Sequence, residues 1–374
     1  MNFWNTFAAL FSNFGALTWQ MVVMWGIGAL LIYLAIVKKM EPSLLLPMGF
    51  GAILVNLPAS GAITQGDTVG PISALFEAGM SNELFPLLLF IGIGAMIDFG
   101  PLLEKPWLML FGAAAQFGIF FTLFLAGFFF DMKDAASIAV IGAADGPTAI
   151  FVANTLKSQY LGAIMVAAYS YMALVPIIQP PVIRLVTTKK ERLIRMPYAE
   201  KQVSKTAKIL FPIIITMVAG LFVPRSVALV GFLMFGNLIR ECGVLDSLSE
   251  TAQKVLANLI TLLLGLTVAS KMQAEYFLNR QTLMILALGL VAFVFDTIGG
   301  VLVAKVYNLF AKQKINPMIG AAGISAFPMS GRVVNKMGLE EDNQNFLLMY
   351  SISVNVSGQI ASVLAGGLIL SLMA

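Results

Sequence analysis

The 374-residue chain is 59% hydrophobic and only 11% charged, with a net charge of +4 and a mean hydropathy of +0.89. This balance excludes an ordinary soluble domain and predicts a protein that lies in a lipid bilayer. The single cysteine, Cys242, excludes an internal disulfide and a cysteine metal cluster. Histidine is absent, so carboxylates, Lys, Arg, Tyr or water must serve any proton-transfer step.

The N-terminal stretch Met1 to Gln20 has no basic n-region and no small-residue cleavage site, so we expect the first span to be retained. Apolar runs from Leu17 to Val37 and from Trp107 to Phe130 exceed the roughly 18 residues of a membrane-spanning helix. No alternation typical of barrel strands occurs. We therefore predict an all-α polytopic membrane protein with about ten spans or broken, re-entrant helices.

Several hydrophobic segments are short and interrupted by polar residues or proline. The apolar run of residues 85–97 stops at Asp98, that of residues 135–144 at Asp145-Gly-Pro147, and that of residues 318–327 at Pro328. Helix breaks at membrane depth are tolerated only inside protein or along a wet cavity. They are typical of ion and substrate transporters.

The interruptions repeat along the chain. Ile141-Gly-Ala-Ala144 aligns with Ile319-Gly-Ala-Ala322, and Leu89-Phe-Ile-Gly92 aligns more weakly with Leu262-Leu-Leu-Gly265. Paired interrupted segments in corresponding halves indicate a binding site near the bilayer midplane. We predict two inverted-repeat halves, residues 1–183 with a broken helix at 141–147 and residues 209–374 with a broken helix at 316–328, joined by a linker of residues 184–208.

The predicted linker is strongly basic. It holds eight of the 23 Lys and Arg residues, against Glu191 and Glu200. Short loops rich in Lys and Arg remain on the inside, so the linker should be cytoplasmic. A docking surface for an acidic partner domain is the alternative interpretation.

Asp145 is the strongest candidate for function. A carboxylate inside a bilayer must face a cavity, hold a cation or carry a proton. The neighbouring glycines allow close backbone approach, and Pro147 frees a carbonyl one turn back, which suits a small, hard cation. The alternative interpretation is that Asp145 only caps the helix that begins at Gly146.

Further polar residues lie in the second half and within the spans. Asn316, Ser325 and Ser330 offer uncharged oxygens at the repeated break, and Arg332 is suited to grip a carboxylate or to anchor a helix end. In the last segment, Ser351, Asn355 and Gln359 form one polar face, whereas Gly358, Ser362 and Gly366 form a small-residue stripe that we assign to helix packing. Asp98, Asp296 and Tyr171 are further buried polar candidates.

Three of these segments resemble the beta subunit of the biotin-dependent, sodium-translocating decarboxylases of oxaloacetate, methylmalonyl-CoA and glutaconyl-CoA. The segments are Ile141 to Phe151, Asn316 to Arg332 and Asn355-Val-Ser-Gly358, and the similarity extends over nearly the whole chain. The resemblance implies a subunit that decarboxylates carboxybiotin and couples this step to Na⁺ export. The compact chain favours an acyl-CoA decarboxylase over the oxaloacetate enzyme.

The resemblance also implies roles for individual residues. Asp145, Asn316, Ser325 and Asn355 would hold Na⁺, Asp145, Arg332 and Tyr171 would act in catalysis, and Arg332 and Gly320 would bind the carboxybiotin. Implied partners are a biotinyl carrier subunit that presents the carboxybiotin, a carboxyltransferase alpha subunit, a small single-span subunit and further copies of this chain. The location would be the cell inner (cytoplasmic) membrane, with no nucleic-acid partner.

Composition alone leaves two other functions open. A Na⁺-coupled secondary transporter or Na⁺/H⁺ antiporter would share the broken helices. A non-catalytic membrane anchor would share the hydropathy.

Overall fold

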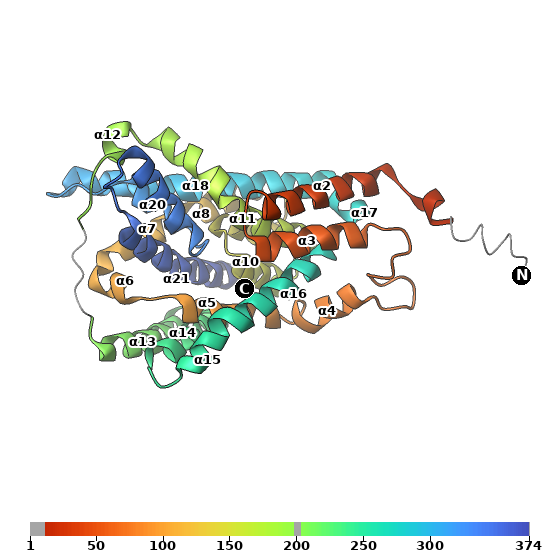
Figure 1. Ribbon diagram of the computed structural model, residues 1–374, viewed down its shortest axis with the longest axis horizontal. Coiled ribbons are helices and arrows are strands. Elements are labelled where there is room, and N and C mark those ends of the chain that lie inside the picture. Colours follow the sequence, from red (N-terminus) through yellow and green to blue (C-terminus); the bar gives the residue numbers. More distant parts are fainter. Residues whose placement is uncertain (1–11, 198–202, 374) are drawn as a thin grey trace, which may run out of the picture. The chain divides into compact units, whose positions relative to one another are not determined.

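A computed structural model describes residues 12–197 and 203–373, and over these residues every regular element is a helix (Figure 1). The prediction of an all-α membrane protein is confirmed. Seven helical stretches are long and apolar enough to cross a membrane, and the bent pair Pro71–Gly79 and Leu84–Met96, which turns by 66°, makes an eighth. The total of about ten spans and broken helices, and the inverted repeat, stay predictions. The N-terminal stretch Met1 to Gln20, for which we predict retention, lies partly outside the described residues.

The chain divides into two compact units that alternate along the sequence. Unit 1 comprises Met1–Phe85 and Asn258–Met284, and unit 2 comprises Pro86–Ala257 and Ile285–Ala374. These units cut the chain differently from the predicted repeat halves of residues 1–183 and 209–374, which the division into units does not test. The predicted active residues all belong to unit 2.

Unit 1 holds two long antiparallel helices and the elements that pack on them. Its elements are η1 (Ser12–Ala16), α2 (Trp19–Ile36), α3 (Pro42–Val55), α4 (Pro71–Gly79), most of α16 (Ala257–Ala269), α17 (Ala274–Phe277) and the first turn of α18 (Arg280–Phe310). The helices α2 and α3 approach closely at Gly28 and Gly49, where a Cβ on either glycine would lie 2.6–2.7 Å from the other's carbonyl oxygen. Close backbone approach at small residues is a usual way to pack helices in lipid.

Asn56 fastens the end of α3 to the chain that follows α16. Its Nδ2 donates to the carbonyl oxygens of Ala52 at 2.7 Å and Met272 at 2.8 Å, and its Oδ1 accepts from the N–H of Ala274 at 2.7 Å. The side chain is buried, so it satisfies backbone groups that water does not reach. One amide therefore ties together two segments that are more than 200 residues apart in sequence.

Unit 2 is built around the C-terminal helix α21 (Leu348–Leu372), of whose 25 residues 17 are buried. This helix contacts α6, α7, α10, α14, α19 and α20, and so reaches both predicted breaks. The other elements are α5 (Leu84–Met96), α6 (Gly100–Glu104), η2 (Pro106–Leu108), α7 (Met109–Ala114), α8 (Phe117–Ala126), α9 (Met132–Ala139), η3 (Val140–Ala143), α10 (Gly146–Thr155), α11 (Leu161–Val186), α12 (Lys189–Arg192), α13 (Lys205–Phe222), η4 (Pro224–Ser226), α14 (Val227–Glu241), α15 (Asp246–Glu250), the π-helical η5 (Thr251–Leu256), α18, α19 (Met318–Ala321) and α20 (Met329–Glu341).

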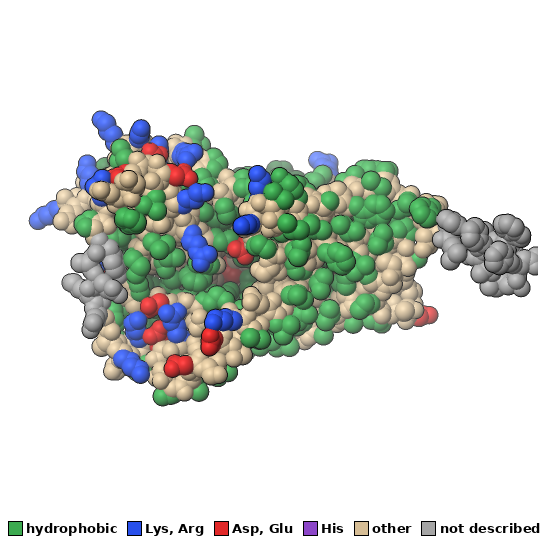
Figure 2. Space-filling view, viewed as in Figure 1, with side chains coloured by type: hydrophobic (Ala, Val, Ile, Leu, Met, Phe, Trp, Pro, Cys, Tyr) green, Lys and Arg blue, Asp and Glu red, His purple; other side chains and the backbone are tan. Residues whose placement is uncertain are grey.

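Polar and apolar surfaces are separated. Large apolar side chains such as Phe124, Leu221 and Phe222 are 65–79% exposed, as expected for helices that face lipid. Figure 2 shows that charged side chains gather over the part of unit 2 that contains α12, α13 and α20. This distribution is that of a membrane protein with one strongly charged loop region.

Replacing Asn56 should destabilise unit 1. In Asn56→Ala the Met272 carbonyl and the Ala274 N–H stay buried without partners, which costs about 1–3 kcal/mol for each group. We expect a clearly lower Tm of the detergent-solubilised protein, measured by a tryptophan-fluorescence melt. The control Asn82→Ala removes an exposed amide that bonds only to its own turn, and its Tm should match the wild type. Equal melting of the two variants would contradict the proposed tie.

Candidate functional site

The first break separates α9 from α10 within a wholly buried stretch. The 3-10 turn η3 ends at Ala144, which has a φ of 52°, and the chain then re-enters a helix at Gly146. Asp145 is the N-cap of α10, and its Oδ1 accepts from the N–H of Thr148 at 3.4 Å. The capping interpretation is therefore correct, but a cap at this place also fixes a carboxylate inside the protein.

The second break lies between α19 and α20, over residues 322–328. Breaking a helix here frees backbone carbonyls that lipid cannot satisfy. Side-chain amides from three other helical regions take their place. Gln179 donates to Ala321 at 2.6 Å, Gln116 to Gly323 at 3.3 Å, and Asn355 to Ile324 at 2.7 Å.

The two breaks meet at Ala143 and Ser325. The backbone N–H and the hydroxyl of Ser325 both donate to the carbonyl oxygen of Ala143, at 3.0 Å and 2.8 Å. On the other side, Gly323 packs directly against Gly358 of α21, where any Cβ would overlap the facing backbone. The predicted small-residue stripe thus does pack a helix, and it brings α21 onto both breaks.

Asp145 is surrounded by neutral donors. Its Oδ2 accepts from the hydroxyls of Thr148 at 2.7 Å and Ser362 at 2.8 Å, and from the amide of Gln359 at 3.2 Å. The side chain is 2% exposed, and no ion pair to it occurs within the described ranges. Neutral dipoles offset only part of the cost of burying a charge. The Asp145 carboxylate therefore needs a bound proton or a nearby cation to offset the rest.

Buried oxygens without donors lie around the second break. Each of the three amides that cap it leaves its own oxygen without a donor, namely Oε1 of Gln116, Oε1 of Gln179 and Oδ1 of Asn355. The hydroxyl of Tyr169, whose ring packs on Gly146, also has no partner. Carboxylate, amide and hydroxyl oxygens are the ligands that hard cations prefer. We name the meeting of the two breaks at Ala143 and Ser325 the crossing, and the buried oxygens near it are of this kind.

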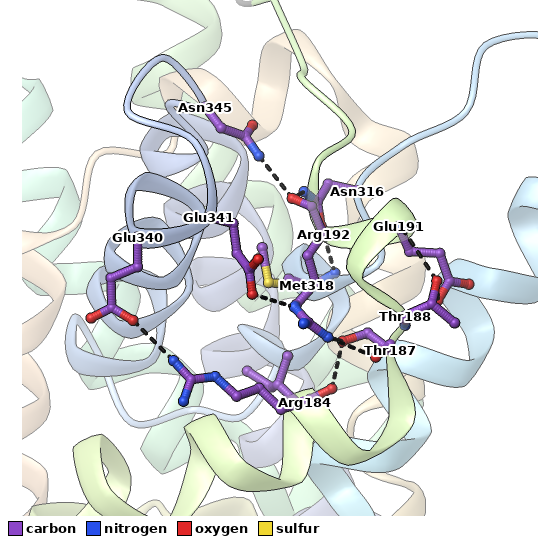
Figure 3. A network of polar contacts seen from close by, with 11 residues as sticks. Arg184, Thr187, Thr188, Glu191, Arg192, Asn316, Met318, Glu340, Glu341 and Asn345 are labelled. Atoms are coloured by element: carbon purple, nitrogen blue, oxygen red, sulfur yellow. Dashed lines mark hydrogen bonds and ion pairs between the residues drawn. The ribbon is translucent and has the colours of Figure 1, made fainter.

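The basic linker is tied to the end of α20 by a row of ion pairs (Figure 3). Arg184 pairs with Glu340 at 3.1 Å, Arg192 with Glu341 at 2.6 Å, and Arg195 with Asp342 at 2.5 Å. The hydrogen bond from Arg195 holds the pKa of Asp342 below its ordinary value, so this contact is lost only when the pH falls through that lowered pKa.

Amides strengthen the same tie. The side-chain amides of Asn316 and Asn345 both donate to the carbonyl oxygen of Arg192, at 2.8 Å and 2.9 Å. Three arginines of the linker are thus already paired within the chain. Lys189 and Lys190 are exposed and form no ion pair among the described residues.

Comparison with known proteins shows where this architecture belongs. The family described as the Na⁺-transporting oxaloacetate decarboxylase beta subunit matches residues 20–373. The chain belongs to this family. It is 44% identical to the oxaloacetate decarboxylase beta chain of Klebsiella pneumoniae, with 93% of this chain and 94% of the relative covered.

Two relatives named for other substrates are as similar. The methylmalonyl-CoA decarboxylase subunit beta of Propionigenium modestum is 46% identical over 96% of this chain and 97% of its own. The glutaconyl-CoA decarboxylase subunit beta of Acidaminococcus fermentans is 46% identical over 97% of this chain and 96% of its own. Identity therefore does not single out one substrate.

The structure brings together three of the four Na⁺ ligands that the resemblance to the beta subunits implies. Asp145, Ser325 and Asn355 lie at the meeting of the two breaks. The hydrogen bonds of Asn316 lie elsewhere, because its amide donates to Arg192 and Ile194 and its oxygen accepts from the N–H of Met318. Their roles as ligands stay predictions.

The other predicted site residues lie apart from Asp145. Arg332 is exposed near the start of α20, and Gly320 packs against Gly300 of α18 so closely that neither position has room for a side chain. The hydroxyl of Tyr171 donates to the carbonyl oxygen of Leu286. This bond fits the interpretation of Tyr171 as a buried, hydrogen-bonded aromatic.

The remaining polar candidates have structural partners. Asp296, which needs a partner, accepts from the N–H of Ile119 at 3.2 Å and keeps its Oδ2 without one. Asp98 lies in the loop after α5, where the apolar run of residues 85–97 ends. Its carboxylate pairs with Lys208 at 3.1 Å. Ser330 donates to Ala321 at the second break, and Cys242 is half-buried.

Sequence reasoning missed several members of the site. Ser362 was assigned to packing but donates to Asp145, and Gln116, Gln179 and Tyr169 were assigned no role. For Gln116 and Gln179 the sequence did carry a signal, namely a glutamine within an apolar span, since an amide at that depth requires hydrogen-bond partners.

The ion pairs between the linker and the end of α20 can be tested with trypsin. Trypsin cleaves after Lys and Arg, so replacing the acidic partners leaves every cleavage site in place. The Arg192–Glu341 pair is 13% and 15% exposed, whereas Arg184–Glu340 is 55% and 46% exposed. Exposed pairs contribute little to stability. We expect Glu341→Gln to speed cleavage within residues 184–208 about tenfold, as a loss of roughly 1.4 kcal/mol implies. Glu340→Gln should cleave at nearly the wild-type rate, and equal rates for both variants would contradict this order of strengths.

Proposed function

We propose that this chain decarboxylates carrier-bound carboxybiotin and couples that step to Na⁺ export. It would act within a sodium-pumping decarboxylase of an acyl-CoA (methylmalonyl-CoA or glutaconyl-CoA) or of oxaloacetate. The observation that carries the proposal is the buried Asp145, ringed by neutral donors at the meeting of two broken helices, in a chain of the beta-subunit family. A buried carboxylate among uncharged oxygens suits an exchange of H⁺ for Na⁺.

The chemistry is a simple cleavage with a proton uptake. The bond between the ring nitrogen and the carboxyl carbon breaks, CO₂ leaves, and the electron pair remains on the nitrogen, which takes up one proton. A poorly hydrated site favours this loss of charge as CO₂. Arg332 would orient the carboxyl group before cleavage, with Gly320 and Tyr171 contributing to the same site.

Coupling would run through Asp145. Binding of Na⁺ displaces the proton of this carboxyl, and the released proton balances the one that the ring nitrogen takes up. Ser325, Asn355 and Asn316 would supply neutral oxygens to the ion. Export works against about 2.3 kcal/mol per charge for each 100 mV, so decarboxylation must be gated by occupancy of the Na⁺ site.

The proposed setting follows from the same chemistry. Carboxybiotin arrives on a separate biotin carrier subunit that an alpha subunit carboxylates, and a small single-span subunit and further copies of the chain complete the complex. The protein would lie in the cell inner membrane, with the basic residues 184–208 on the cytoplasmic side.

Asp145→Asn should abolish Na⁺-coupled turnover while the complex still assembles. Asparagine caps a helix as well as aspartate does, so the change removes the charge and keeps the cap. Asp131→Asn is a matched control, because Asp131 caps α9 with the same type of bond but is exposed. The measurement is release of CO₂ from free carboxybiotin, with uptake of radioactive Na⁺, by the native complex in proteoliposomes.

The same vesicles test the alternative functions. If wild-type complex consumes no carboxybiotin with or without Na⁺, the proposal is wrong. Na⁺ uptake driven by a pH difference alone would then favour an antiporter or Na⁺-coupled transporter. Unchanged coupled turnover in Asp145→Asn would favour a membrane anchor.

Ser362→Ala should weaken Na⁺ binding without abolishing turnover. The variant removes one of the three donors that position Oδ2 of Asp145, and a hydrogen bond to a charged group contributes about 1.5–3 kcal/mol. We expect the Na⁺ concentration for half-maximal decarboxylation to shift about tenfold, as a difference near the lower bound implies. Ser353→Ala in the same helix removes only a bond to the carbonyl oxygen of Met349 and should leave this concentration unchanged.

A further inference from the structure

A cavity of 530 Å³ lies beside the basic linker in unit 2. Its walls include η2, the end of α18 and the linker itself. The residues that define its chemistry are Lys105, Trp107, Arg195, Tyr307, Lys314 and Tyr350. This size falls within the range of small-molecule binding pockets.

Two stacked aromatic rings form one wall of the cavity. The rings of Trp107 and Tyr307 lie 5.3 Å apart with only 9° between their planes, and Trp107 is 37% exposed. Phe111 packs edge-on against both rings and holds them in place. A fixed, accessible aromatic face binds flat rings by stacking.

The cavity is positively charged. Lys105, Arg195 and Lys314 line it, and no Asp or Glu is among the described residues that do so. Arg195 is neutralised by Asp342, whereas Lys314 is exposed at the mouth and has no ion pair in the part of the chain that the structure describes. Lys105 is held in place by the neutral Tyr350, whose hydroxyl it contacts at 2.9 Å and whose ring lies 4.2 Å away. The cavity therefore suits a ligand that is both flat and anionic.

The cavity is close to the second break. One helical turn leads from Trp107 to Phe111, and the carbonyl oxygen of Phe111 lies 2.5 Å from where a Cβ on Gly323 would sit. Ile315, another residue of the wall, directly precedes Asn316. Its carbonyl oxygen accepts from Nδ2 of Asn308 and its N–H donates to Oδ1 of Asn308, both at 2.8 Å. A ligand in the cavity would therefore lie next to the residues that pack against the second break.

We propose that this cavity is the docking site for the carboxylated cyclic urea of carboxybiotin, with the ring stacked on Trp107 and the carboxylate facing Lys314. The identity of the ligand rests on the function proposed above, whereas its class, a flat anion, rests on the cavity alone. In this proposal the cavity binds the carboxybiotin first, and the cleavage step follows at the crossing. Residues of the cavity therefore set KM, and those at the crossing set the rate and the Na⁺ dependence.

The test is the kinetics of free carboxybiotin decarboxylation by the purified native complex. Lys314→Gln and Trp107→Leu should each raise KM about tenfold, the equivalent of one lost charge or stacking contact. The kcat and the Na⁺ concentration for half-maximal rate should stay at wild-type values. Two controls match these changes: Lys312→Gln removes an equally exposed lysine that does not line the cavity, and Trp107→Phe keeps a stacking face.

The outcomes separate the two proposals. An active wild type whose KM is unchanged by both Lys314→Gln and Trp107→Leu overturns the docking site and leaves the proposed function standing. A wild type that consumes no carboxybiotin overturns the proposed function. The cavity is then tested without turnover, in a Cys242→Ser background, by labelling a cysteine introduced as Gln313→Cys with a maleimide. Protection by biotin, relative to Lys312→Cys, supports the site, and equal labelling of both cysteines overturns it.

Discussion

The architecture of unit 2 depends on how the backbone groups freed by two helix breaks are satisfied inside the protein. Water cannot reach them in a bilayer, and an unpaired group there costs several kcal/mol. Ser325 resolves the problem for the first break by donating twice to Ala143. Amides from α11, α21 and the start of α8 resolve it for the second. Each break is stable only because the other elements surround it.

This solution creates the chemistry of the site. Every amide that donates its NH₂ group to a freed carbonyl turns its own oxygen away from it, and those oxygens are left without donors. Asp145, at the first break, has neutral donors only. Under the proposed function a cation would complete such oxygens, because it needs acceptors and supplies positive charge. The residues that satisfy the freed carbonyls would then also be the ones that offer oxygens to the ion.

The sequence predicted some of these features for physical reasons. An aspartate followed by Gly-Pro inside an apolar run has few explanations, so Asp145 could be found from sequence. Ser325 could be found because its motif repeats. Partners that come from other helices could not be found, because periodicity within α21 does not reveal what faces Ser362. Asn316 illustrates the same limit, because its place beside the second break in sequence does not reveal that the carbonyls of Arg192 and Ile194 in the linker accept its amide hydrogens.

The division of unit 1 has a consequence for biogenesis. Its first part ends at Phe85 and its second begins at Asn258, so the 172 residues from 86 to 257 separate them. At about 5–20 residues per second, the ribosome needs roughly 9–35 seconds to make that interval. Throughout this time α3 stands in the membrane without the partners of Pro47, Gly51 and Asn56. The amide of Asn56 then has only its bond to Ala52, two of its three partners being absent, and the small-residue face of α3 is uncovered until α16 arrives.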